Sequence, residues 1–330
     1  MTDFREIAEL RALLQGSSDL LRHRVLCEVE ASGGRRFPVV GLTLGSEDRS
    51  HPTLGLFGGV HGLERIGSRI ILAWLVSFLE RIRWDEHARR RLETLRIVAI
   101  PVVNPGGVAM FRRGNPAGVD LMRNAPVESL ERNPFPFGGH RLSPRLWYYR
   151  GREGDPMEPE ARALTEFVQE EMFSSRAAIS LDFHSGFGFS DRLWYPYAKM
   201  TGGFPRTIEV LNLAALLDAT YPQNTYRVEA QSVNYTTHGD LWDWLFDLHL
   251  ARHGADGPVF IPWTLELGSW NWVRKNPRQL LTFSGAFNPT VPHRLRRVMR
   301  GHLTLCDFFL HAVHNPDAWA RKRLRQEDGS

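Results

Sequence analysis

The sequence predicts a single α/β domain whose mixed, largely parallel β-sheet is flanked by helices. Strand-like apolar runs alternate with helical patterns along the chain, and the sequence contains no internal repeat. This alternation is typical of domains in which helices cover the faces of a sheet. Polar residues of interest follow several of the apolar runs, at His61, Asn104, His184 and Glu266. Open α/β sheets bind their ligands at such strand ends, so the functional site is expected there.

The first half of the chain contains the opening strands of this sheet and its first long helix. Short apolar runs bounded by Gly, Pro or Asn are typical of strands, and a 3.6-residue apolar period is typical of helices. These patterns predict, in chain order, a helix at 3–14, strands at 23–30, 37–44 and 53–60, a helix at 65–82 and a strand at 95–103. The helix at 65–82 is too apolar for a purely surface helix, so we expect it to be packed in the interior.

The second half begins with a long segment that has little periodicity. Residues 106–154 are rich in Gly, Pro, Asn and Arg, and a loop of this length in a compact protein usually has a function. Beyond it the patterns predict a helix at 158–172, a strand at 177–183, a helix at 207–217, a strand at 260–267 and a helix at 291–314. We expect one domain over residues 1–320 and a disordered, charged tail at 321–330.

The charge balance does not favour a nucleic-acid partner. The 330 residues include 41 Lys and Arg against 37 Asp and Glu, which gives a formal net charge of +4. Only Lys199, Lys275 and Lys322 are lysines, so the other 38 basic residues are arginines. They are interspersed with acidic residues along the chain, whereas nucleic-acid-binding domains concentrate basic residues on one face.

Targeting and membrane signals are absent from the sequence. The longest apolar stretch, at 70–79, is ten residues long, whereas a membrane-spanning helix needs about 20. Cys27 and Cys306 stand near opposite ends of the chain and suggest no disulfide framework, which suits a reducing compartment. We therefore expect a cytoplasmic protein that does not interact with a membrane.

The sharpest local motif is His61-x-x-Glu64, between a glycine-rich strand end and a helix. Residues three apart on a helical turn point to one side, so the imidazole and the carboxylate can bind one cation. Alone, the motif is equally compatible with a surface histidine and a first-turn glutamate that the helix dipole stabilises. His184 follows a second strand, 120 residues after Glu64. Two histidines and one glutamate form a ligand set typical of catalytic zinc sites.

These residues belong to a longer series of motifs that resembles the zinc carboxypeptidase family, including its short cytoplasmic bacterial members. The series is His61-x-x-Glu64, Asn104-Pro-x-Gly107, Arg113-x-Asn-x-x-Gly-x-Asp120 followed by Arg123-Asn124, His184-Ser185, Tyr235 followed by Gly239, and Glu266. The order and spacing of these motifs extend over residues 55–270, which is most of the chain.

The resemblance implies a role for each motif. His61, Glu64 and His184 would bind one Zn²⁺ with a water in the open coordination position, and Glu266 would be the general base. Arg113 would stabilise the oxyanion of the tetrahedral intermediate. The neighbouring Arg112 is an alternative for that role.

The resemblance assigns two further residues to positions around this centre. Asp120 would accept a hydrogen bond from the second ring nitrogen of His61 and fix its tautomer. An aspartate in a local turn after Gly118 is the alternative for this residue. Tyr235 would cover the substrate from a polar loop, the alternative being a tyrosine buried in the core.

The sequence departs from the family where a substrate carboxylate would be bound. Arg123 can form a bidentate pair with a carboxylate, and Asn124 is a second candidate for substrate binding. Met122, however, occupies the position of the family's asparagine and offers no amide donor. Trp242 is at the position of the side-chain-pocket residue, where a large ring either argues against a charged substrate side chain or packs elsewhere.

The sequence therefore predicts a zinc-dependent hydrolase, a metallopeptidase of carboxypeptidase or amidase type, that cleaves an amide bond next to a carboxylate-bearing residue. The expected substrate is a small peptide or an N-acyl amino acid. One alternative is a deacylase similar to succinylglutamate desuccinylase or aspartoacylase, and another is a non-catalytic zinc-binding relative. The sequence does not predict an oligomeric state.

Overall fold

The computed structural model describes residues 4–17, 19–282 and 284–320. In this part of the chain, eight strands form one mixed sheet in the order β1-β2-β4-β3-β5-β8-β6-β7. The strands are β1 Arg22–Ala31, β2 Arg35–Gly45, β3 Thr53–Gly58, β4 Arg96–Ile100, β5 Ala177–Ser185, β6 Arg192–Tyr195, β7 Arg227–Ala230 and β8 Val259–Leu267. The central strands β4, β3, β5 and β8 are parallel to their neighbours in this group. The prediction of an α/β fold with a mixed, largely parallel sheet is confirmed for these residues.

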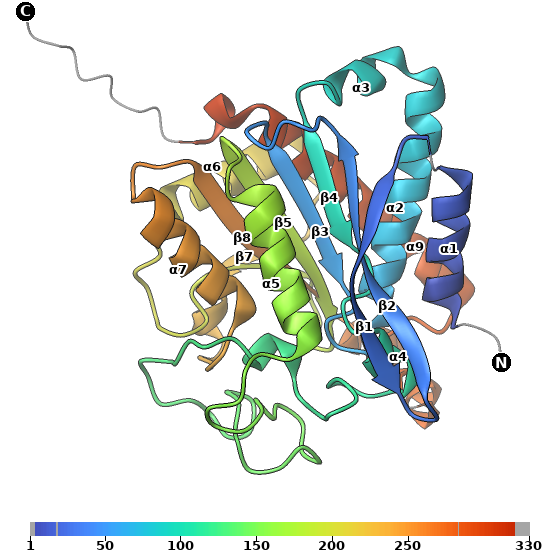
Figure 1. Ribbon diagram of the computed structural model, residues 1–330, viewed down its shortest axis with the longest axis vertical. Helices are drawn as coiled ribbons and strands as arrows, with labels where there is room; N and C mark the ends of the chain where they lie inside the picture. The colour runs from blue at the N-terminus through green and yellow to red at the C-terminus, as the bar shows by residue number, and fades with distance from the viewer. Residues whose placement is uncertain (1–3, 18, 283, 321–330) are drawn as a thin grey trace, which may run out of the picture.

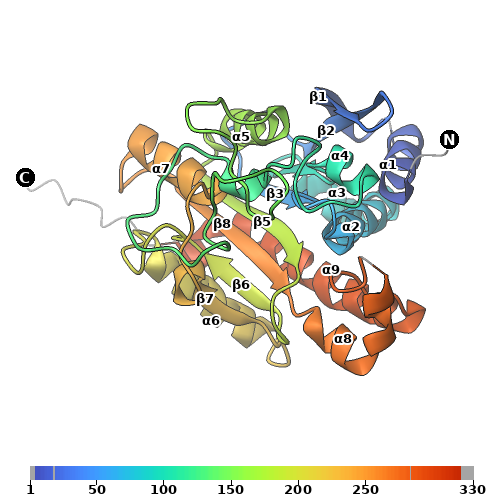
Figure 2. The same cartoon turned by 90° about the horizontal axis from the view of Figure 1, so that it is seen from below.

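Helices cover both faces of the sheet (Figure 1). Helices α5 and α7 lie on one face, and α2, α6 and α9 lie on the other, as the view from below shows (Figure 2). The α-helices are α1 Arg5–Gly16, α2 Arg65–Trp84, α3 Glu86–Arg91, α4 Pro105–Ala109, α5 Pro159–Met172, α6 Thr207–Thr220, α7 Leu241–His253, α8 Trp270–Lys275 and α9 Pro292–His314.

The core lies between the sheet and these helices. The strand β3 is buried at every position, and the helix α2 buries Ile66, Ile70 and Ile71 completely. A helix that packs against both a sheet and neighbouring helices needs apolar residues on several sides. This environment explains the high apolar content that the sequence shows at 65–82.

Local signals account for the ends of several helices. Pro159 and Pro292 occupy the first turns of α5 and α9, where a missing backbone N–H costs nothing. Asp240 accepts hydrogen bonds from the backbone N–H groups of Trp242 and Asp243 and so caps α7. Asp85 ends α2 and caps α3 through Ala88.

The structure contains elements that the sequence patterns do not predict. These are the edge strand β7, its neighbour β6 and the helices α3, α4, α7 and α8. Helix α7 has the sequence LWDWLFDLHLARH, with apolar residues on every side and therefore no visible helical period. Strands β6 and β7 are four residues long each, too short for a clear alternation. The predicted tail at 321–330 lies outside the described residues.

The parallel strands bring their carboxyl ends to one edge of the sheet. Strands β3, β4, β5 and β8 all end there, and the long segment between α4 and α5 lies at the same end of the molecule (Figure 1). Among the described helices, none has a stretch long and apolar enough to cross a lipid bilayer.

Two helical glycines give opposite expectations for stability. A β-carbon on Gly67, in α2, would lie 2.6 Å from the carbonyl oxygen of Phe183. We expect Gly67→Ala to lower the free energy of unfolding by about 1–3 kcal/mol because the helix must move away from the sheet.

Gly301, in α9, is the matched control because a β-carbon there meets no atom within 4 Å. Gly301→Ala should raise the free energy of unfolding by about 0.5–1 kcal/mol, since alanine is the better helix former. Denaturant unfolding of both variants measures the two changes. Equal effects of the two substitutions would contradict the tight helix–sheet contact at Gly67.

Candidate metal centre and active site

The loop after β3 is shaped by a close contact between two backbone segments. A β-carbon on Gly62 would lie 2.2 Å from the carbonyl carbon of Gly107, so only glycine fits there. The N–H of Gly62 donates to the carbonyl of Arg113 at 3.1 Å. Asn104 strengthens the junction, since its side chain accepts from Gly107 N and donates to Val60 O. The predicted strand-end residue Asn104 is therefore a structural cap.

His61, Glu64 and His184 meet at the carboxyl ends of β3 and β5. Nδ1 of His61 lies 2.9 Å from one Glu64 carboxylate oxygen, and Nδ1 of His184 lies 3.1 Å from the other. The two Nδ1 atoms are 3.2 Å apart. All three side chains are buried. The sequence prediction that these three residues converge is thus matched by their geometry.

The second nitrogen of each histidine faces a buried carboxylate. Nε2 of His61 lies 3.0 Å from an Asp120 carboxylate oxygen, and Nε2 of His184 lies 2.9 Å from one of Asp182. Nη2 of Arg113 also lies 2.9 Å from Nε2 of His61. If each ring carries its proton on Nε2, both Nδ1 lone pairs are directed at the space beside Glu64, as binding of a cation there requires. Asp120 occupies the supporting position expected from the sequence. Asp182 was not predicted, although its place two residues before His184 puts it on the same face of β5.

Trp242 supports this arrangement from behind. Its ring is 2% exposed, packs against Phe57, and its Nε1–H donates to Asp182 at 2.8 Å. This placement corrects the expectation that Trp242 lines a substrate side-chain pocket. The physical reason is that α7 places the indole in the core, where its N–H reaches the same Asp182 oxygen that Nε2 of His184 contacts.

Arg113 joins the carboxylates on the other side of the cluster. Its Nε donates to Asp120 at 2.9 Å and its Nη1 to Glu64 at 3.1 Å. Arg112 is exposed on the surface, so Arg113 is the arginine that faces the cluster. Burial alone would raise the pKa of Asp120, but the charges of Arg113 and His61 outweigh it and hold this pKa well below its usual range.

These residues fit a divalent metal ion. One nitrogen or oxygen from each of His61, Glu64 and His184 lies within 4.8 Å of the others. Both imidazoles are oriented by carboxylates through their second nitrogen, which is the usual arrangement around histidine ligands. Two neutral nitrogen donors and one carboxylate are a donor set typical of zinc. Residues His61, Glu64 and His184 would therefore hold the ion.

Glu266 lies at the end of β8 beside this cluster. It is directly paired with His184 across the two parallel strands, and its Oε1 accepts from the N–H of Phe187 at 3.0 Å. Burial first, and then the charge of Glu64, raise the pKa of Glu266 to about 8. A cation beside His184 would lower this pKa again, because it would stabilise the carboxylate.

Tyr235 and Arg123 lie in the same polar region. Tyr235 is half-buried, and its ring contacts those of Phe187 and Trp194. Burial raises the pKa of Tyr235 to about 12, while the nearby positive charge of Arg123 opposes the shift. Arg123 is 3% exposed and donates to the carbonyls of Phe137 and Met122. Within the described residues, no carboxylate lies within ion-pair distance of Arg123.

The neighbours of Arg123 serve the fold. Met122 belongs to the hydrophobic core. The Asn124 side chain donates to the carbonyl of Arg150 and accepts from the N–H of Glu158. Both the NH₂ group and the oxygen of this amide are hydrogen-bonded to the backbone. The structure therefore corrects the expectation that Asn124 binds substrate. Arg123 is then the charged group in this triplet with donors to spare.

Tyr148 is a residue of the site that no sequence pattern predicts. Its ring stacks on the guanidinium of Arg113, 4.6 Å from the ring centroid, and contacts Phe137. The backbone of Tyr148 has φ +69°, a conformation that non-glycine residues seldom adopt and that is enriched at functional sites. The long segment at 106–154 thus provides both Arg113 and the ring that covers it.

A model of the zinc carboxypeptidase family matches residues 24–267 of the chain. Among curated proteins, the chain is 30% identical over 109 residues to probable carboxypeptidase 2 of Trichophyton verrucosum, an alignment over 32% of this chain and 20% of that protein. The aligned segment therefore spans about a fifth of the length of that relative.

Two solved structures share this fold. Bovine thrombin-activatable fibrinolysis inhibitor superposes with a TM-score of 0.66 at 17% identity, over 96% of this chain and 98% of that one. Carboxypeptidase A of Helicoverpa armigera gives a TM-score of 0.63 at 18% identity, over 97% and 74% of the two chains.

The contact between Asp182 and His184 can be tested by metal titration. We expect Asp182→Asn to weaken binding of Zn²⁺ about 10–100-fold, because the amide no longer fixes His184 with Nε2 protonated. Asp247→Asn is the control, since this carboxylate pairs with Lys199 and Tyr197 away from the cluster. Equal zinc affinities of the Asp182 variant and the parent chain would contradict the supporting role of Asp182.

Proposed function

Because the chain belongs to the zinc carboxypeptidase family, whose model matches residues 24–267, we propose that it hydrolyses an amide bond next to a residue that carries a free carboxylate. The observation that carries this proposal is the buried His61, Glu64 and His184 cluster with Glu266 beside it. Metal ligands, a separate carboxylate and an arginine are groups with which an enzyme can hydrolyse an amide through a metal-activated water.

The metal centre and Glu266 have different roles in the activation of water. A bound Zn²⁺ would supply a Lewis acid that polarises the scissile carbonyl and lowers the pKa of a water molecule. Glu266 takes a proton from the attacking water and passes it to the departing nitrogen. Its side chain suits this role because Phe187 N orients one oxygen, and the other oxygen is free to accept the proton.

Arg113 and Tyr235 act on the reacting carbonyl and on the substrate. The guanidinium of Arg113 is held by Asp120, Glu64 and the ring of Tyr148, so its remaining N–H donors are preorganised for a developing oxyanion. Tyr235 remains protonated at neutral pH, since its pKa is raised to about 12. Its hydroxyl can therefore donate a hydrogen bond to a substrate group.

Arg123 binds the substrate carboxylate in this proposal. Its charge is buried and its described surroundings offer carbonyl oxygens instead of a carboxylate partner. A buried guanidinium of this kind is stabilised when a bound anion provides a negative charge to pair with it. A small peptide with a free C-terminus provides such an anion next to the bond that is cleaved.

One structural feature favours a second candidate, a deacylase acting on N-acyl amino acids. Met122 is packed in the core and Asn124 is engaged with Arg150 and Glu158. Arg123 thus lacks the neighbouring side-chain amide that, in the family, would bind a peptide C-terminus together with the arginine. A cytoplasmic location stays a prediction, as does the choice between these substrates.

Removal of the base separates catalysis from metal binding. We expect Glu266→Gln to lower kcat by about 10²–10⁴-fold, because the amide cannot accept a proton. Zinc content should stay at that of the parent protein, since Glu266 is not among the metal-binding residues. Elemental analysis and peptide hydrolysis measure the two properties on the same preparation. Retained hydrolysis in the Glu266 variant would refute the assignment of the base.

Substrates with free and amidated C-termini test the role of Arg123. We expect the parent enzyme to prefer free C-termini and Arg123→Ala to lose about 10–150-fold in kcat/KM on them, because a charge-assisted hydrogen bond contributes about 1.5–3 kcal/mol. Amidated peptides should show little change.

Arg112→Ala is the matched control, since this exposed arginine lies in the same segment. A parallel series of N-acyl amino acids decides between the peptidase and the deacylase. If the parent enzyme cleaved free and amidated peptides equally fast, Arg123 would have no part in carboxylate recognition.

A further inference from the structure

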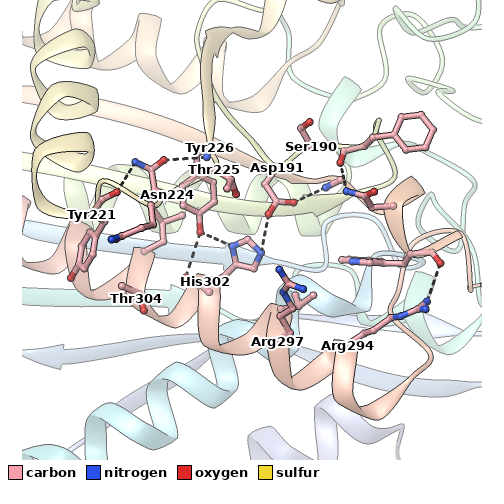
Figure 3. Close-up of a pocket in the computed structure, with 18 of the residues that line it drawn as sticks. Ser190, Asp191, Tyr221, Asn224, Thr225, Tyr226, Arg294, Arg297, His302 and Thr304 are labelled. Atoms are coloured by element: carbon pink, nitrogen blue, oxygen red, sulfur yellow. Dashed lines mark hydrogen bonds and ion pairs between the residues drawn. The ribbon is translucent and has the colours of Figure 1, made fainter. Parts of the chain in front are cut away.

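A large cavity opens away from the residues of the proposed active site. It has a volume of about 790 Å³ and lies between α9, the segment that joins α6 to β7, and the loop that joins β5 to β6. Figure 3 shows its wall from α9, with Arg294, Arg297 and His302, near Asp191 and Tyr226 from the other segments. None of the proposed metal-binding or catalytic residues lines this cavity.

The cavity has an excess of positive charge. Lys275, Arg294 and Arg297 line it together with a single carboxylate, Asp191. Arg294 donates to the carbonyls of Trp272 and Lys275, which orient its guanidinium without neutralising it. Within the described residues, Lys275, Arg294 and Arg297 have no carboxylate within ion-pair distance. Cations without acidic partners in a concave site attract anions.

Some of the other arginines on the surface form ion pairs with nearby carboxylates. Arg90 pairs with Glu86 one helical turn away, and Arg24 pairs with Glu170. In these ion pairs a nearby carboxylate neutralises the charge of the arginine. The cations around this cavity are not neutralised in that way, although acidic residues are plentiful in the sequence.

The single carboxylate of the cavity is engaged with the protein. Asp191 accepts from the N–H of Gly268 at 2.9 Å, and its other oxygen lies 3.7 Å from Nε2 of His302. Nδ1 of His302 in turn lies 2.9 Å from the Tyr226 hydroxyl. Asp191 is therefore directed at Gly268 and His302, and it does not form an ion pair with Arg297.

Aromatic rings and a glycine give the cavity an apolar part with room for a ligand. Tyr221, Tyr226 and Trp272 contribute to its walls. Gly301 lies among them on α9, and a β-carbon there would meet no atom within 4 Å. Pockets with apolar walls and a few charged groups are typical of sites for small organic ligands.

We infer that this cavity binds a small organic anion, with a phosphate or carboxylate group at Arg297, Arg294 and Lys275 and an apolar body against the aromatic walls. The site is separate from the metal centre, so the inference does not depend on the proposed hydrolysis.

Calorimetric titration of the metal-loaded, full-length chain with three probes tests the inference. Phenyl phosphate and benzoate carry the two anionic groups on the same ring, and phenol is the neutral control. We expect at least one of the two anions to bind about tenfold or more tightly than phenol, because charge-assisted hydrogen bonds add to ring contact. Binding of phenyl phosphate alone assigns a phosphate group, and binding of benzoate alone assigns a carboxylate.

Variants then locate the binding. Arg297→Ala should weaken anion binding about tenfold or more, whereas Arg296→Ala, on the same helix but outside the cavity, should not. Gly301→Leu should abolish binding by filling the open space, and Gly301→Ala should preserve it. Arg123→Ala removes only carboxylate binding at the proposed substrate site, so the anion binding that remains in this variant belongs to the cavity.

Three outcomes would overturn the inference. They are no binding of either anion to the parent chain, equal loss in the Arg296 and Arg297 variants, and unchanged binding in a folded Gly301→Leu variant. Circular dichroism establishes that each variant is folded. Because hydrolysis is not measured, an inactive chain that still binds the anion in this cavity leaves the inference intact.

Discussion

The parallel register of β3, β5 and β8 is the constraint on which the whole site depends. Gly58 pairs with Phe183, and His184 pairs with Glu266. Side chains alternate between the two faces of a strand, so a slip by one residue would turn His184 away from both Glu64 and Glu266. Helix α2 fits this register closely, since its Gly67 lies against Phe183 where two strands are paired. Packing in the core thereby determines the distance between the metal-binding residues and the base.

The same burial gives two carboxylates opposite properties because their partners differ. Asp120 lies between Arg113 and His61, and these positive partners keep its pKa low. Glu266 has a backbone N–H as its direct partner and the charge of Glu64 nearby, so its pKa rises to about 8. The first carboxylate is suited to holding side chains in place, and the second is suited to exchanging protons. Enzymes often separate such roles by environment instead of by residue type.

Sequence reasoning predicted the parts of the site that lie directly after strands. His61, Glu64, His184 and Glu266 could be found because strand ends and motif spacing are local features. Contacts that depend on tertiary packing could not: Trp242 reaches Asp182 from a helix whose apolar sequence conceals its period. Asp182 could have been predicted, because it lies two positions before His184 and so on the same face of the strand. Tyr148 could not, because its stacking contact with Arg113 within a long loop produces no periodic pattern in the sequence.

The order of the strands in the sheet also bears on how the protein folds. Glu64 and His184 are 120 residues apart in the chain, yet they lie at the ends of neighbouring strands. A further 73 residues separate Ser185, at the end of β5, from Val259, at the start of its neighbour β8. Contacts of such long sequence separation form late and slowly. We therefore expect the metal-binding cluster to assemble near the end of folding. Only a chain with a complete sheet would then bind the metal ion, and this binding would stabilise the folded state by mass action.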